Sequence, residues 1–170
     1  NENELIRIRD AEKGVVRSAV LPTVFDVAGD GPALQQALDA LCKEAEKAVT
    51  QGRSFLILSD RAADSAHAPI PSLLALSAVH QHLVRRQLRT HVALVADAGE
   101  AREVHHSAAL IGFGADAVCP YLALATLRDL CARKLYLHDD PEDACAHYVK
   151  AVGKGLLKVM SKMGISTLQS

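Results

Sequence analysis

The chain has 170 residues, a length that suits a single domain with a sizeable core. Hydrophobic residues make up 49% of it, yet it has no tryptophan, three phenylalanines and three tyrosines, so small aliphatic side chains must fill that core. Its formal net charge of −1 argues against a nucleic-acid surface, because such surfaces carry an excess of lysine and arginine that neutralises phosphates.

No apolar run reaches the roughly 18 residues that span a bilayer, and the N-terminus has no signal-peptide pattern. We therefore expect a cytoplasmic chain with no membrane or nucleic-acid partner. The cysteines lack C-x-x-C spacing and sit in apolar or helical surroundings, which favours reduced, buried thiols over disulfides, zinc or iron–sulfur sites. They are Cys42, Cys119, Cys131 and Cys145.

The first part of the chain contains one clear helix. Residues 1–18 are polar and charged without a clear apolar face, which indicates a connecting arm or a frayed edge. Residues 19–25 form an extended segment, which Pro22 restricts to an edge strand or a loop. Apolar residues then recur at helical spacing over residues 34–49, and Gly52 marks the end of the predicted helix.

Strands and helices alternate after that helix. The pattern predicts strands at residues 54–58, 91–96 and 117–119, a long loop at 59–71, and helices at about 72–88, 101–111 and 122–134. Such alternation is typical of parallel βαβ units, and the strands are too few for a complete eight-stranded barrel. We expect an α/β fold in which these units form a partial TIM-barrel-like domain, with an open α/β sheet as the alternative.

The last part of the chain predicts a long helix. Asp140 suits its N-cap and Pro141 its first position, and the helix should reach Met163 with a break near Gly153 or Gly155. Gly164 is expected to end it, and residues 165–168 are expected to begin another strand.

Polar clusters follow two of the predicted strands. Ser59, Asp60 and Arg61 follow the first, and Asp97 and Glu100 follow the second. Because the carboxyl ends of parallel strands meet at one edge of a sheet, these residues should lie near one rim. We expect a structural or docking rim made of Ser59, Asp60, Arg61, Asp97, Glu100 and Arg102, with an ion pair between Asp60 and Arg61.

Two alternatives involve chemistry at individual residues. Ser59, Asp60 and Arg61 with Asp64 and His67 could assemble an acid–base site, although no G-x-S-x-G motif surrounds the serine. The histidine pairs at 80 and 82 and at 105 and 106 diverge on their helices, and H-E-x-x-H is absent. No metal site is predicted, although one histidine of each pair could still converge with Glu103.

Several long motifs in register resemble one known family. They are ILSDR at 57–61, IPSLLA at 70–75, AVH at 78–80, GEAREVHH at 99–106, and GADA with PYLA at 114–123. In this order and spacing they resemble the central domain of the glutamate synthase large subunit. The segment GLLKVMSKMGISTLQS at 155–170 resembles the start of the FMN-binding barrel of that family.

After the arm at 1–18, in which no motif of the family is found, the resemblance implies a central domain at 19–152 and the start of the barrel domain at 153–170. Family members make glutamate from glutamine and 2-oxoglutarate with reducing equivalents, using FMN and a 3Fe-4S cluster. The catalytic amidotransferase cysteine, most of the barrel and the cluster cysteines are absent from this chain. It is therefore expected to be a non-catalytic connector that holds no cofactor alone. The rival reading is a freestanding α/β enzyme that uses the 59–67 loop and could depend on a metal.

Partners and cofactor neighbours also follow from the resemblance. The chain would contact the amidotransferase and FMN domains of the same polypeptide, and a reductase subunit is a further partner that the family allows. Ser166, Thr167 and Gln169 would lie near FMN in the parent enzyme. An apolar face around Leu156 and Met160 would favour self-association of the separate chain.

Overall fold

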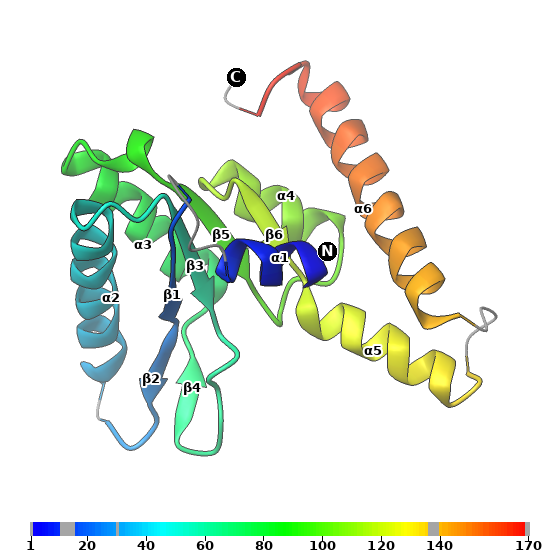
Figure 1. Cartoon of the computed structure of the whole chain (residues 1–170), viewed down its shortest axis with the longest axis horizontal. Helices are drawn as coiled ribbons and strands as arrows, with labels where there is room; N and C mark the ends of the chain where they lie inside the picture. Colours follow the sequence, from blue (N-terminus) through cyan, green and yellow to red (C-terminus); the bar gives the residue numbers. More distant parts are fainter. Residues whose placement is uncertain (1, 11–15, 30, 136–139, 169–170) are drawn as a thin grey trace.

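The structure is a computed structural model that describes residues 2–10, 16–29, 31–135 and 140–168. Figure 1 shows a central sheet with helices on both sides and a long helix at the C-terminal end. The strands are β1 (Ser18–Pro22), β2 (Val24–Asp26), β3 (Phe55–Ser59), β4 (His67–Pro69), β5 (Ala93–Asp97) and β6 (Ala117–Cys119). The helices are α1 (Glu2–Arg9), α2 (Ala33–Thr50), α3 (Ser72–Arg85), the 3-10 turn η1 (Arg89–His91), α4 (Val104–Gly112), α5 (Tyr121–Ala132) and α6 (Pro141–Met163).

The main sheet has four parallel strands in the order β1-β3-β5-β6. Its strands lie side by side in chain order, as they do in a barrel wall, but no closed barrel forms among the described residues. The predicted parallel βαβ units are thus confirmed, and the sheet is open. The short strands β2 and β4 form a separate antiparallel pair beyond one end of the sheet (Figure 1).

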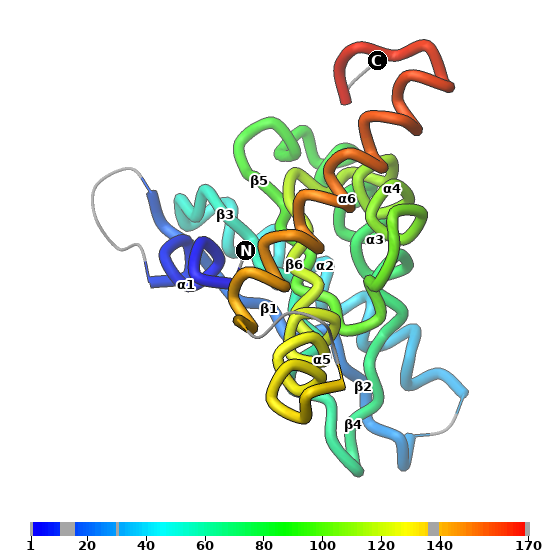
Figure 2. Tube along the Cα trace, turned by 90° about the vertical axis from the view of Figure 1, so that its right-hand side faces the viewer, coloured from blue at the N-terminus to red at the C-terminus, as the bar shows by residue number. Residues whose placement is uncertain are grey.

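The two faces of the sheet are covered unequally. Helices α2, α3 and α4 pack on one face and form the larger core, which includes the fully buried Leu56, Leu76 and Leu94. On the other face, Leu5 of α1 packs with Ile57, Val95 and Cys119. Figure 2 shows α1 and α3 on opposite sides of the sheet. Strand alternation explains this division, because successive side chains of a strand point to opposite faces.

The structure contradicts three predictions of secondary structure, two in the first half of the chain and one in α6. Residues 2–9, expected within an arm without a clear apolar face, form α1, which buries Leu5. The loop predicted at 59–71 contains β4, because its backbone pairs with β2. Helix α6 runs unbroken through Gly153 and Gly155.

The predicted strand at residues 165–168 is also wrong. Gly164 takes the left-handed conformation with φ of 70°, and the N–H of Ile165 bonds back to the carbonyl of Met160 at 3.1 Å. The backbone therefore closes the end of α6 and does not extend into a sheet. The predicted start of α6 is confirmed, since the Asp140 side chain accepts a hydrogen bond from the Glu142 N–H and Pro141 is the first helical residue.

Across the described ranges, no helix has both the length and the apolar character needed to cross a bilayer.

Candidate functional site

Strands β3 and β5 end side by side, and their last residues form the centre of the site. Ser59 and Asp97 are register partners, and only 6% and 2% of their surfaces are exposed. The Ser59 hydroxyl donates to Oδ2 of Asp97 at 2.8 Å. A buried carboxylate thus lies at the carboxyl edge of the sheet, where it needs a cation.

Arg61 supplies that cation from the loop after β3. Its Nε donates to Oδ2 of Asp97 at 2.7 Å and its Nη2 to Oδ1 at 3.1 Å, while the guanidinium group lies 4.0 Å from the centre of the Tyr121 ring. Burial alone would lower the pKa of Arg61, but the hydrogen bonds and charge of Asp97 outweigh burial and raise it. Arg61 therefore stays charged, and the two-pronged pair fixes its position.

Asp60 has a different partner from the one that the sequence predicts. Both of its carboxylate oxygens accept the Gly99 N–H, at 3.1 and 2.9 Å, whereas Arg61 binds Asp97. The expected ion pair between Asp60 and Arg61 is therefore wrong, because Asp60 binds the backbone of the loop after β5 while Arg61 binds the last residue of β5. Burial, followed by the Asp60 carboxylate, raises the pKa of Tyr121 beside this loop.

Glu100 and Arg102 lie on the loop after β5 but contact other elements. Oε1 of Glu100 accepts from the N–H and the hydroxyl of Ser72, at 2.6 and 2.5 Å, and so caps the start of α3. The helix predicted at about 101–111 begins only at Val104, which leaves Glu100 and Arg102 on the loop before it. The Arg102 carbonyl accepts from the Tyr148 hydroxyl of α6 at 2.8 Å.

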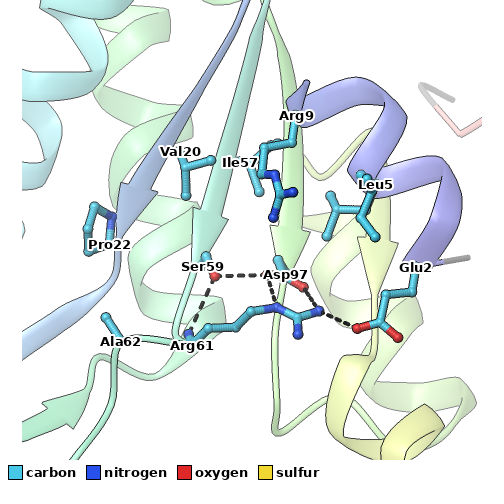
Figure 3. A pocket seen from close by; sticks show the side chains of 11 residues that line it. Glu2, Leu5, Arg9, Val20, Pro22, Ile57, Ser59, Arg61, Ala62 and Asp97 are labelled. Carbon is cyan, nitrogen blue, oxygen red and sulfur yellow. Dashed lines mark hydrogen bonds and ion pairs between the residues drawn. The ribbon is translucent and has the colours of Figure 1, made fainter. Parts of the chain in front are cut away.

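Ser59, Arg61 and Asp97 form what we call the strand-end cluster, and helix α1 brings Glu2 to it (Figure 3). Its Oε1 accepts from Nη2 of Arg61 at 3.1 Å, and its Oε2 accepts from Nη1 of Arg128 at 2.8 Å. A hollow of about 350 Å³ lies beneath α1, with Leu5 and Ile57 in its wall. The sequence contains no signal for Glu2, because its two arginine partners are 59 and 126 residues away along the chain.

The side chains of the rival acid–base site fall into separate groups, because Asp64 and His67 pair with each other while Ser59 and Arg61 bind Asp97. Nδ1 of His67 lies 2.9 Å from Oδ1 of Asp64, whereas the Ser59 hydroxyl donates to Asp97. The expected divergence of His80 and His82 is confirmed, since His82 contacts Glu46 of α2 and His80 accepts a hydrogen bond from Arg89. Within the described ranges, no three His, Cys, Asp or Glu side chains are grouped to hold a metal.

All four cysteines are free thiols, as their spacing predicts. Cys119, Cys131 and Cys145 are buried, and Cys42 is half-buried. Burial, followed by the nearby Asp97 carboxylate, raises the pKa of Cys119 to about 12. This thiol is therefore a poor nucleophile, although it lies next to the cluster.

The positions expected near a flavin lie apart from this cluster. Ser166 and Thr167 are exposed residues beyond the end of α6, and Gln169 lies outside the described residues. A flavin ring needs an enclosing pocket, and the non-strand segment 165–168, exposed at 166–168, does not form one. The residues of this segment that the structure describes therefore do not fit FMN on their own.

The fold and the site define a parallel α/β domain whose strand-end cluster is closed by its own ion pairs. The chain belongs to the family of glutamate synthase central domains, since the model of that family matches residues 1–170. The chain is 52% identical, over 81% of its length, to a glutamate synthase (NADPH) large chain of Bacillus subtilis. It is 48% identical over 79% of its length to a glutamate synthase (NADH) of Schizosaccharomyces pombe, and 42% identical over all of its length to a chloroplastic ferredoxin-dependent glutamate synthase of rice.

These relatives are far longer than the chain. It covers 9%, 6% and 11% of their respective lengths. The family resemblance inferred from the motifs is thus confirmed, and the chain corresponds to one part of a much larger polypeptide.

Proposed function

We propose that this domain connects the amidotransferase and FMN-binding domains of a glutamate synthase polypeptide and keeps their active sites in a fixed relation. Catalysis belongs to those other domains. The observation that carries the proposal is the state of the strand-end cluster, where Ser59, Arg61 and Asp97 bind one another. A cluster that is closed in this way suits a rigid support better than a reactive site, because its nucleophile and its charges already have partners.

The cofactors and other partners of the parent enzyme are part of the same proposal. FMN and a 3Fe-4S cluster would be held by the parent polypeptide, a reductase subunit would supply electrons in some members, and the parent would be cytoplasmic. Ser166, Thr167 and Gln169 would approach FMN only where additional polypeptide encloses the flavin.

We also propose that the central domain covers residues 19–152 and that residues 153–170 lead into the barrel. Burial along α6 supports this boundary, because its buried residues, Ala144 and Cys145, both precede residue 153. Residues 1–18 would be the connecting arm, part of which is folded as α1.

A coupling experiment tests the connector role in a full-length glutamate synthase that contains this domain. Arg61→Ala should lower the amount of glutamate formed per glutamine hydrolysed, while glutaminase activity and ammonia-dependent glutamate formation persist. Arg86→Ala, a change at an exposed arginine of the same domain, is the matched control. Loss of either half-reaction with intact coupling would instead indicate a catalytic role for the cluster.

The separate 170-residue chain offers a second test. It should be colourless, should not hydrolyse glutamine, and should give no saturable heat of binding with FMN, zinc or manganese in titration calorimetry. Purified yellow protein with stoichiometric flavin would contradict the proposal, and saturable metal binding would favour a freestanding metal enzyme.

A further inference from the structure

The carboxylate of Glu2 lies between two arginines from distant parts of the fold. Arg61 follows β3 and Arg128 belongs to α5, and each donates to a different oxygen of Glu2, at 3.1 and 2.8 Å. Arg61 is also held by Asp97, and Arg128 by Glu142 at 2.9 Å. The two guanidinium groups are thus positioned by other carboxylates, and each directs an N–H group toward the same place (Figure 3 shows the Arg61 side).

The surroundings of this place favour a negatively charged carboxylate. The Glu2 side chain is 25% exposed, and those of Arg61 and Arg128 are 39% and 33% exposed. Burial alone would raise the pKa of Glu2, but the hydrogen bonds from Arg128 and Arg61 outweigh it and lower that pKa. Arginine pairs suit carboxylates because the planar guanidinium presents several N–H donors in a fixed geometry.

Helix α1 is also held on the sheet by the partly buried Ile8, which packs beside Leu5, and by the Arg9 carbonyl, which accepts from the Ser18 hydroxyl of β1 at 2.7 Å. Leu5 is its one buried residue, and its eight residues are too few for a stable helix without tertiary contacts. With so little buried surface, α1 also relies on the Glu2 carboxylate for its position on the sheet, and loss of that carboxylate should loosen the helix.

We propose that Arg61 and Arg128 form a carboxylate-binding site, and that Glu2 is the resident ligand of this site, supplied by the chain itself. When the Glu2 side chain is removed, a small free carboxylate binds in its place. The proposal does not rest on the connector role. It assigns to the two arginines a ligand class, with one carboxylate oxygen for each guanidinium group.

Chemical rescue tests the site. The variant Glu2→Ala should keep the circular dichroism of the wild-type chain but unfold about 2–4 °C lower and exchange the amides of residues 5–8 faster. Acetate, compared with chloride at equal ionic strength and pH 7, should raise the Tm of the variant in a saturable way. The wild-type chain should show no acetate-specific rise, because the tethered Glu2 has a high effective concentration at the site.

Two variants control for simple charge effects. Glu44→Ala removes the same charge from an exposed position of α2 and should give no acetate-specific effect. The double variant Glu2→Ala with Arg128→Gln should lose the acetate effect, and Arg128→Lys can replace Arg128→Gln if that chain does not fold. Equal effects of acetate and chloride on Glu2→Ala would overturn the proposal. An unchanged Tm with unchanged exchange in α1 would overturn it as well.

Discussion

Asp97 is the most deeply buried charged residue of the strand-end cluster. Only 2% of its surface is exposed, and moving a carboxylate out of water costs several kcal/mol unless cations and hydrogen-bond donors replace the solvent. Arg61 and Ser59 provide these partners, and the guanidinium group of Arg61 also stacks on the Tyr121 ring. The buried Asp97 carboxylate therefore needs Arg61 as its cation. Arg61 is partly in water and could be solvated without Asp97.

Replacing Arg61 with alanine should therefore destabilise the domain. We expect a loss of about 2 kcal/mol, less than the roughly 3–5 kcal/mol for a fully buried pair, because the Arg61 side chain is 39% exposed. Urea unfolding at pH 7 measures the change. Arg86→Ala is the control, since its pair with Glu46 is at the surface and its loss should matter much less. Equal, small effects of the two changes would mean that water replaces Arg61 beside Asp97.

The thiols should react in an order set by burial. Cys42 is half-buried, whereas the other three cysteines are buried, and burial raises the pKa of both Cys42 and Cys119. A raised pKa leaves less thiolate at pH 8, so Cys119 should react slowly with a disulfide reagent and Cys42 should react first. Mass spectrometry of labelled peptides identifies the order, and guanidinium chloride should expose all four thiols. Rapid labelling of Cys119 in the folded chain would contradict the structure.

At the scale of single elements, the sequence predicts best those elements that bury an apolar stripe. Helix α2 could be located because its apolar residues recur at helical spacing, and five of them are buried. Helix α1 could not, since it buries a single leucine and its ion-pair partners are far away in the chain. The break predicted in α6 was wrong, because a glycine inside a helix costs only about 1 kcal/mol, which a helix of 23 residues tolerates.

The two glycines of α6 should respond in opposite ways to alanine. A Cβ on Gly155 would overlap Cγ2 of Val104 in α4, whereas a Cβ on Gly153 would meet no atom within 4 Å. Gly153→Ala should stabilise the domain by about 0.5–1 kcal/mol through helix propensity, and Gly155→Ala should destabilise it by about 1–3 kcal/mol. Paired urea curves give both values. Stabilisation by both changes would indicate that α6 does not pack closely on α4.

For the site as well, the sequence predicts contacts set by the strand pattern but not contacts set by tertiary packing. Placing Ser59 and Asp97 together required only the rule that parallel strands end at one edge, which the sequence pattern supplies. The choice of Asp97 over Asp60 as the partner of Arg61 depends on the path of the loop after β3, which no periodicity encodes. Glu2, Arg128 and Glu142 meet only because three helices pack near one another, so their contacts require the tertiary structure.

Stability should be distributed unevenly over the molecule and should be lowest toward the end of α6. The buried residues of this helix are Ala144 and Cys145, near its start, whereas Leu157 and Met163 are 66% and 68% exposed. A helix end with so few buried contacts opens locally at a small fraction of the global unfolding free energy. We expect amides of residues 157–163 to exchange on the order of 100-fold faster than those of the central strands β3 and β5.

Hydrogen exchange followed by mass spectrometry measures this gradient, and sedimentation must first establish that the sample is monomeric. A second copy of the chain could cover the exposed apolar face of α6, in which case protection of residues 157–163 should rise with protein concentration. In a monomer, protection of these residues equal to that of β3 would show that the end of α6 belongs to the core of this domain. The proposed boundary near residue 153 would then have to move toward the C-terminus.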